Sequence, residues 1–224
     1  MDRRTLIFSK QPTPGAVKTR LVPTLSPELA AELAQAMLDD RVQSGFLCHD
    51  FSAALAIAPA EAVDWARDRY PHLEVTVQRG ADLAARMAHA FESTCAPGRS
   101  VVIVGSDCPL LAARTVVDAH AALEAGADIA LAPDSGGGYC LIGLRRSRPE
   151  LFQLEMSTSN MFAQTVRVAE EAGMRVELLP EHYDVDEPAD LERLTLDLEA
   201  GGETQQRAFP RRTFDFLKRF QSVS

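Results

Sequence analysis

Three positively charged side chains follow the first apolar run of the chain, residues 5–8. Lys10, Lys18 and Arg20 lie in one proline-containing loop, with Gly15 between them. Glycine lets a backbone approach a ligand closely, and ammonium and guanidinium groups pair with phosphate oxygens. These residues therefore predict a site for a di- or triphosphate, with Lys18 also catalytic. The alternative is a solvated loop whose charges are incidental.

The choice of lysine in this loop supports the first interpretation. The chain holds 23 lysines and arginines, yet only three are lysine, and two of these lie in the loop. A compact, mobile ammonium is thus favoured there over the planar guanidinium used elsewhere. The spacing matches neither the phosphate loop of P-loop NTPases nor the glycine pattern of dinucleotide-binding proteins.

A single carboxylate follows the most strand-like run of the sequence. The run 101–104 is entirely apolar and β-branched, which is typical of a central strand covered on both faces. Asp107 comes shortly after it, and Gly105 between them permits close approach. A carboxylate at this end of a strand can hold Mg²⁺ or Mn²⁺, which would bridge phosphate oxygens. We predict that Asp107 binds the metal and is catalytic; as a cap for a helix over 112–125 it lies too early.

A glycine-rich turn is a third candidate site. The segment 133–139 contains three consecutive glycines after an apolar run. Their backbone N–H groups could face an anion or a sugar, so Asp134 and Gly137 are predicted nucleotide contacts. An ordinary turn that joins two strands is an equally good interpretation.

Two alternating carboxylates precede Pro188. Asp184 and Asp186 would share one face of an extended segment, and either could be a second metal ligand. Asp184 is favoured slightly, because Asp186 lies nearer the start of the next helix. The alternative is that both carboxylates simply stabilise that helix N-terminus electrostatically.

Strand and helix patterns alternate along nearly the whole chain. This alternation predicts an α/β fold with an open, mostly parallel sheet and helices on both faces. In such sheets ligands bind at the carboxyl ends of the strands, where the candidate loops would gather. Strands are expected at 5–8, 51–57, 73–77, 101–104, 129–132, 139–144 and 176–179. Helices are expected from Ser26 to a stop at Gly45, over 60–69, 82–95 and 112–125, from caps at 157–159 to Gly173, and over 188–199.

Length and composition limit the remaining possibilities. The 224 residues suit one domain, residues 1–200, followed by a polar and phenylalanine-rich tail, 201–224, that would dock on the body or form a homodimer contact. The net charge of −9 argues against non-specific nucleic-acid binding. We expect no membrane span, no signal peptide and a cytoplasmic location. Four scattered cysteines predict reduced thiols rather than a zinc site or disulfides: Cys48, Cys95, Cys108 and Cys140.

Taken together, the motifs resemble a known family. The run from Lys10 to Leu21, the segment Gly-Ser-Asp-Cys-Pro-Leu at 105–110, the turn 134–139 with the following Leu-Ile-Gly, and Asp-Val-Asp-Glu-Pro at 184–188 look like the small bacterial GT-A-type glycosyltransferases of the nucleotide-diphospho-sugar transferase group. They are also similar to phospholactate guanylyltransferases and, more distantly, to molybdenum-cofactor guanylyltransferases. The resemblance covers about residues 4–199.

The resemblance implies a GT-A fold, nucleotide phosphates near the cation loop and a divalent metal at Asp107. One departure bears on the reaction. Metal-dependent glycosyltransferases of this type usually carry Asp-x-Asp, whereas here the first position is Gly105. A single aspartate is closer to the guanylyltransferase arrangement. A second departure is Glu187, which stands where Thr or Ser often precedes the proline.

Three functions stay open at this point. The first is nucleotidyl transfer from a nucleoside triphosphate to a small-molecule acceptor, with Mg²⁺ or Mn²⁺. The second is glycosyl transfer from a nucleotide sugar at the same site. The third is a nucleotide-binding subunit without catalysis. Either transfer would depend mainly on orientation and charge neutralisation, without a covalent enzyme nucleophile.

Overall fold

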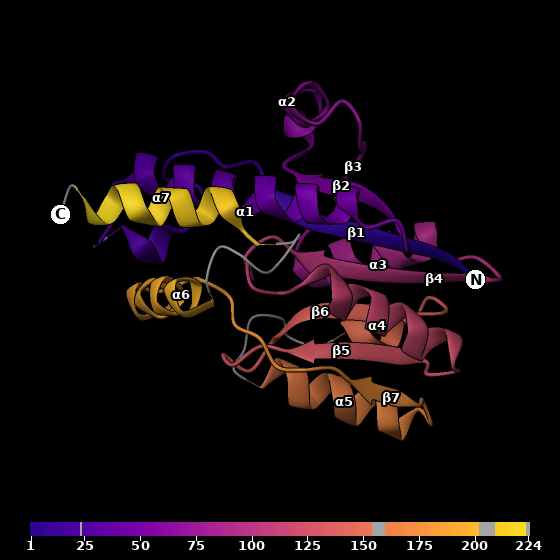
Figure 1. The fold of residues 1–224 in the computed structure, drawn as a ribbon. Coiled ribbons are helices and arrows are strands. Elements are labelled where there is room, and N and C mark those ends of the chain that lie inside the picture. Colours follow the sequence, from indigo (N-terminus) through magenta and orange to yellow (C-terminus); the bar gives the residue numbers. More distant parts are fainter. Residues whose placement is uncertain (23, 154–159, 202–208, 223–224) are drawn as a thin grey trace.

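A seven-stranded sheet forms the centre of the molecule (Figure 1). The computed structural model describes residues 1–22, 24–153, 160–201 and 209–222. The strand order is β3-β2-β1-β4-β6-β5-β7, and only β6 runs antiparallel to its neighbours within this sheet. The expected mostly parallel sheet is thus confirmed. The strands are β1 (Asp2–Lys10), β2 (Ser52–Ala58), β3 (Glu74–Val77), β4 (Arg99–Gly105), β5 (Ile129–Pro133), β6 (Tyr139–Leu144) and β7 (Val176–Leu178).

Helices cover both faces of the sheet, each face with its own apolar core. Leucine, isoleucine and valine side chains of the strands pack against α1, α2 and α4 on one face, and against α3 and α5 on the other. The helices are α1 (Pro27–Leu47), α2 (Val63–Arg69), α3 (Leu83–Thr94), α4 (Ala113–Glu124), α5 (Met161–Glu171), α6 (Pro188–Gly201) and α7 (Arg211–Gln221). Short 3-10 turns occupy Thr19–Leu21, Ala60–Ala62 and Pro149–Phe152.

The helix starts follow the expected capping chemistry, but one expected end is wrong. Ser26 accepts a hydrogen bond from the Leu29 N–H at the start of α1. Gly45 does not stop this helix, which continues to Leu47. A Cβ at Gly45 would lie 3.3 Å from the Ala53 Cβ, so the glycine instead lets α1 lie close to the sheet. The caps expected at 157–159 lie outside the described residues.

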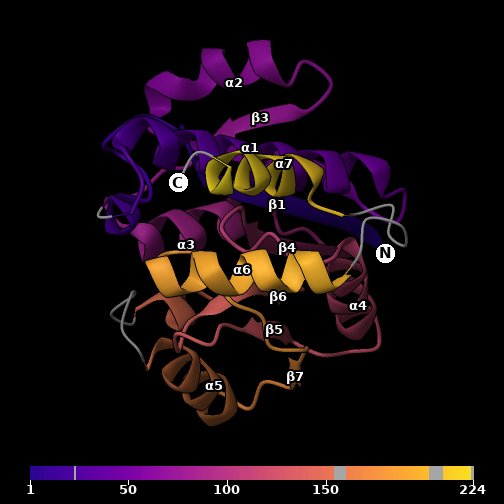
Figure 2. The ribbon, with the colours of Figure 1, turned by 60° about the vertical axis from the view of Figure 1, so that its left-hand side comes forward.

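The C-terminal tail forms a helix that is not among the elements expected from the sequence. Helix α7 lies beside α1, and α6 and α7 flank the carboxyl ends of the strands (Figure 2). Asp40 of α1 caps α7 by accepting hydrogen bonds from the N–H and hydroxyl of Thr213, each 2.8 Å long. The tail therefore docks on the body of its own chain.

A third apolar core joins this helix to both segments of the expected site. It includes Leu21 and Leu25, which follow the cation loop, and Val185, which lies between the two alternating aspartates. Phe214 and Leu217 of α7 pack into the same core. Burying these side chains fixes the two segments relative to one another.

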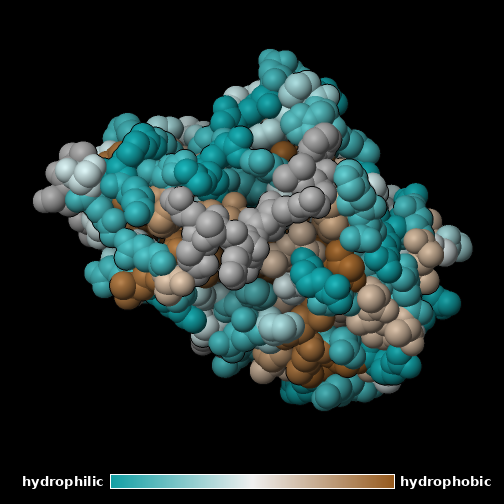
Figure 3. All heavy atoms as spheres, in the orientation of Figure 1, coloured by the Kyte–Doolittle hydropathy of each residue, from teal (hydrophilic) through white to brown (hydrophobic). Residues whose placement is uncertain are grey.

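The surface in the view of Figure 3 is mainly hydrophilic. The exposed large hydrophobic side chains are spread over several elements: Met1, Val22, Leu83, Leu178 and Leu196. In the described parts of the chain, no helix combines the length and apolar character needed to span a membrane.

Candidate functional site

The buried ammonium of Lys18 is the centre of the candidate site. Its side chain is only 4% exposed, and its Nζ lies 2.7 Å from Asp107 Oδ1 and 3.0 Å from Asp186 Oδ1. Burial by itself lowers the pKa of Lys18, but the two carboxylates more than offset this, so the pKa is raised above its ordinary value. The lysine therefore stays protonated at the floor of the site.

The backbone of Lys18 is held in an unusual conformation. Its φ of 49° lies in the left-handed region, which side chains other than glycine, asparagine and aspartate rarely adopt. Such a conformation costs of order 1–3 kcal/mol and persists only where the surroundings enforce it. Here the following turn is anchored by Leu21, which is fully buried in the third core. The loop thus directs the ammonium inward between the two acids.

The loop after β4 is held by a buried arginine that the sequence patterns did not single out. The guanidinium of Arg41, in α1, donates to the carbonyl oxygens of Cys108 (2.6 Å) and Leu111 (2.7 Å). The carbonyl of Asp107 accepts from the Val185 N–H at 3.0 Å, which ties this loop to the segment of the two alternating aspartates. Asp107 is therefore positioned through its backbone on both sides.

Of the two alternating aspartates, Asp186 is the one that reaches Lys18. Capping of α6 falls to Asp190 instead, whose Oδ2 accepts from the N–H groups of Asp186 (3.0 Å) and Glu187 (2.8 Å). The Asp186 carboxylate is therefore free of the helix N-terminus and turns toward the cation. The slight preference for Asp184 in the sequence analysis rested on assigning this capping role to Asp186.

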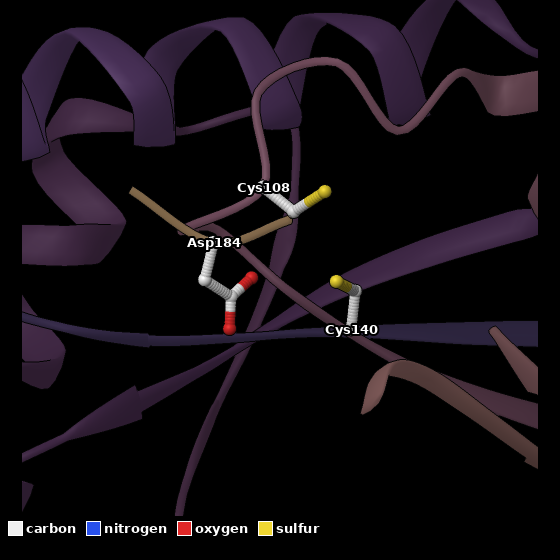
Figure 4. Close-up of side chains that lie close together, drawn as sticks. All are labelled: Cys108, Cys140 and Asp184. Carbon is white, nitrogen blue, oxygen red and sulfur yellow. The ribbon is translucent and has the colours of Figure 1, made fainter. Parts of the chain in front are cut away.

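Asp184 points into a buried cluster beneath the site. Its carboxylate lies beside the thiols of Cys108 and Cys140 (Figure 4). Burial is the main cause that raises the pKa of Asp184 to about 7, and the nearby negative charges of Asp107 and Asp134 raise it further. Contact with the Cys108 thiol, followed by burial, raises the pKa of Cys140.

The acids and lysines face a cleft of about 560 Å³ at the carboxyl ends of the strands. Lys10 and Lys18 line it together with Asp107 and Asp186. Arg86, from the first turns of α3, adds a cation to the same cleft. Opposite charges from distant parts of the sequence thus meet in one hollow, as the sequence analysis expected.

Gln78 lines the cleft but belongs to none of the sequence motifs. It follows β3, and its side-chain amide donates to the carbonyls of Ser9 (2.9 Å) and Ala56 (2.7 Å), which joins the ends of three neighbouring strands. Its position directly after an expected strand was the one feature of the sequence that could have indicated it.

A larger groove, about 830 Å³, lies along the sheet beside α3 and shares Gln78 and Arg86 with the cleft. It lacks Lys18 and the acids, so the smaller hollow is the candidate site.

Four of the predicted contacts are not among the residues that line the cleft. Arg20 is 70% exposed and lies 4.0 Å from Glu187, while Gly15 is exposed with a φ of 75°. Asp134 uses its carboxylate to accept from the N–H of Gly136 in its own turn (2.9 Å) and from the N–H of Asp184 in the segment before α6 (3.1 Å). The fourth is Gly137, whose N–H donates to the Asp134 carbonyl.

The chain is similar in sequence to a family of bacterial proteins and to two named enzymes. A family model described as "Uncharacterized protein conserved in bacteria (DUF2064)" matches residues 41–159. The 2-phospho-L-lactate guanylyltransferase of Methanothermobacter thermautotrophicus is 33% identical over 187 residues, which are 80% of this chain and 78% of that protein. The enzyme of the same name from Methanoregula boonei is 28% identical over 184 residues, 81% and 78% of the two chains.

A solved structure shares the whole architecture. A protein from Desulfovibrio desulfuricans, assigned by name to the nucleotide-diphospho-sugar transferases, superposes with a TM-score of 0.86 at 28% identity, covering 98% of this chain and 99% of that one. The expected GT-A fold and the expected family resemblance are thereby confirmed. The expectation of a transferase with nucleotidyltransferase-like use of a nucleotide is confirmed as well.

Proposed function

We propose, from the premise that this chain belongs to the DUF2064 family of bacterial proteins, that it transfers a nucleotidyl group from a nucleoside triphosphate to a small phosphorylated acceptor. The observation that carries this proposal is the buried ammonium of Lys18 between Asp107 and Asp186 in the cleft. A fixed cation beside two carboxylates suits a ligand that brings both phosphates and a metal ion.

The two carboxylates fit a divalent metal. Asp107 and Asp186 each keep 49% of their side chain exposed, and both approach the same Lys18 nitrogen, so their oxygens converge. Carboxylate oxygens are the ligands that Mg²⁺ and Mn²⁺ prefer. We propose that these two residues hold the ion, which would supply charge neutralisation on the nucleotide phosphates.

The chain's own residues would bind and orient the reactants. Lys18, with its raised pKa, keeps its proton and donates to a phosphate oxygen as negative charge develops there. Lys10 and Arg86 lie where they can neutralise the other phosphates. An oxygen of the acceptor attacks the α-phosphorus, a new P–O bond forms, and the bond to the β-phosphate oxygen breaks as pyrophosphate leaves.

The names of the relatives indicate which reactants to test first. Both curated relatives are called 2-phospho-L-lactate guanylyltransferases. We therefore propose GTP as the donor and a small phosphorylated carboxylic acid as the acceptor class. Cations at the cleft suit such an acceptor, since it carries negative charge on both of its groups.

Glycosyl transfer is the second candidate, favoured by the name of the Desulfovibrio protein. It would place a nucleotide sugar in the same cleft, with attack at the anomeric carbon and release of the nucleoside diphosphate. Gly105 favours the nucleotidyl reaction over this one, because it removes the first acid of the Asp-x-Asp pair that metal-dependent sugar transfer uses.

Release of pyrophosphate tests the proposal directly. The full chain is incubated with each of the four ribonucleoside triphosphates, Mg²⁺, and a panel of phosphorylated hydroxy acids that includes 2-phospho-L-lactate. Pyrophosphate and a new diphosphate linkage in the ³¹P spectrum are expected with GTP, and both should be lost in Asp107→Asn. Release of a nucleoside diphosphate from a nucleotide sugar, with no pyrophosphate, would establish glycosyl transfer instead. Nucleotide binding without turnover under every condition would establish a non-catalytic subunit.

A further inference from the structure

A second cluster of potential ligand atoms lies beneath the cleft. Cys108 comes from the loop after β4, Cys140 from the start of β6, and Asp184 from the segment before α6. Their two sulfurs and one carboxylate oxygen all lie within 4.8 Å of one another. Figure 4 shows the three side chains around a common space. The thiols are too far apart in sequence to form a metal-binding pattern, so the fold alone reveals the cluster.

The carboxylate of this cluster lacks a polar partner. Its backbone N–H donates to Asp134, but across the described residues we find no hydrogen bond or ion pair to the Asp184 carboxylate oxygens. Cys108 is 0% exposed and Cys140 5% exposed, so both thiols are shielded from water, whereas the Asp184 side of the cluster is partly exposed. A carboxylate left unpaired in such surroundings is stabilised by binding either a proton or a cation.

We propose that Cys108, Cys140 and Asp184 bind one thiophilic divalent ion of the zinc class. Thiolate sulfur is a soft ligand that selects zinc over magnesium, whereas the acids of the cleft offer oxygen alone. Bond lengths of about 2.0–2.3 Å place the ligands of a tetrahedral zinc ion roughly 3.3–3.8 Å apart, which the observed cluster accommodates. The fourth position is left for solvent on the side of Asp184, the one partly exposed member.

The surrounding charge suits a bound ion. Two thiolates and one carboxylate together exceed the charge of a divalent cation by one negative unit. The buried guanidinium of Arg41, 2.6 Å from the Cys108 carbonyl, supplies the compensating positive charge. On binding, two S–H bonds break, their protons leave to solvent and two sulfur–metal bonds form.

Such an ion would connect the same segments that form the cleft. Cys108 directly follows Asp107, and Asp184 lies two positions before Asp186. The inference does not depend on the proposed transfer reaction, because the ligands lie outside the cleft and metal binding can be measured without any turnover.

Cobalt absorption tests the site. The reduced, chelator-treated full chain is titrated with Co²⁺, which reports thiolate ligation through a near-ultraviolet charge-transfer band and tetrahedral geometry through intense visible bands. We expect one cobalt ion per chain, displaced by one equivalent of Zn²⁺ and unaffected by excess Mg²⁺. Cys108→Ser and Cys140→Ser should each remove the charge-transfer band, and Asp184→Asn should weaken binding at least about tenfold. The matched control is Cys95→Ser, a half-buried thiol elsewhere in the molecule, which should change nothing.

Several results would overturn the inference. One is a wild-type chain that gives no thiolate band, which needs no variant and so does not depend on variant folding. Another is a band that survives in both serine variants while circular dichroism shows them folded. A third is a mass two hydrogens lower, mapped to a Cys108–Cys140 disulfide, in protein kept with Zn²⁺ but without reductant, because a bound ion would protect both thiols from oxidation.

Discussion

The cation loop and the glycine turn look alike in sequence but use their polar groups differently. Both follow a strand at its carboxyl end, and both were predicted to contact the nucleotide. In the cation loop, the Lys18 ammonium points to two carboxylates that are half exposed to the cleft. In the glycine turn, Asp134 accepts from nearby backbone N–H groups, and Gly137 donates back to Asp134. Spacing locates polar groups, but only the fold shows whether they are already satisfied by one another.

The largest expected effect is that of Lys18→Met on turnover. Losing one preorganised charge donor should lower kcat/KM for pyrophosphate release about 10²–10³-fold. The mechanism requires the loss to fall mainly on kcat, because the charge that Lys18 meets develops during transfer. Steady-state kinetics with GTP and the best acceptor of the panel would measure it.

Lys10→Met is the matched control for this change. Lys10 lines the same cleft but is exposed, so its loss should cost about fivefold or less. Equal losses in the two variants would contradict the central role of Lys18. They would indicate that the loop acts only by its total charge.

The next effect separates the two alternating aspartates. Asp186→Asn should raise the Mg²⁺ concentration needed for half-maximal activity at least about tenfold, because a ligand beside Asp107 is weakened. Asp184→Asn should change this concentration much less, since its carboxylate lies in the thiol cluster. Magnesium titrations of both variants would decide, and the reverse ranking would return the metal role to Asp184.

These residues also mark how far the sequence could lead. Alternating strand and helix patterns, and caps such as Ser26, predicted the sheet and most helices because they depend on local chemistry. The pairing of Lys18 with Asp107 was predictable in outline, since strand ends meet at one edge of a parallel sheet. That Asp186 rather than Asp184 reaches Lys18 was not predictable, because it depends on Asp190 capping α6.

Long-range packing explains the remaining errors. Glycine often ends a helix, but Gly45 lies inside α1, where a larger side chain would collide with residues of β1 and β2. Arg41 has the type of a surface residue, but its guanidinium is buried against the loop of Asp107. Helix α7 is a different case, because Phe214, Leu217 and Phe220 recur at spacing three, a local pattern from which the helix could have been predicted. Only its packing partners, α1 and α6, are set by contacts between distant parts of the chain.

A pair of glycine substitutions sharpens the comparison on a smaller scale. Gly15 and Gly137 have φ values of 75° and 91°, so alanine strains the backbone at both, by roughly 1–3 kcal/mol. Gly137→Ala should lower the free energy of unfolding while leaving the KM for GTP unchanged within about twofold. Gly15→Ala, in the exposed cation loop, should lower the free energy of unfolding as well but should also raise this KM. Urea unfolding and kinetics on both variants would measure the two effects; a raised KM in Gly137→Ala alone would make the glycine turn the nucleotide site.

The smallest expected effect is on how the free energy of unfolding depends on pH. It reports the electrostatic coupling of Asp184 to Asp107 and to Asp134 of the glycine turn. Burial, Asp107 and Asp134 raise the folded-state pKa of Asp184 to about 7, above its ordinary 3.8, while Lys18 opposes them. The folded chain therefore binds this proton more tightly than the unfolded chain does. Between about pH 4 and 7, the contribution of Asp184 to the free energy of unfolding must fall as pH rises, and it becomes constant above the folded pKa.

Asp184→Asn should remove this part of the slope in denaturant titrations of the metal-free chain across the same pH range. Asp134→Asn removes one neighbouring negative charge, so it should lower the folded pKa of Asp184 and shift the end of the fall to lower pH. A slope that is unchanged in Asp184→Asn would show that this carboxyl is not perturbed in the folded chain. If the slope is lost in Asp184→Asn but the end of the fall is not shifted in Asp134→Asn, the glycine turn has no electrostatic influence on Asp184, and the contrast between the two loops is complete.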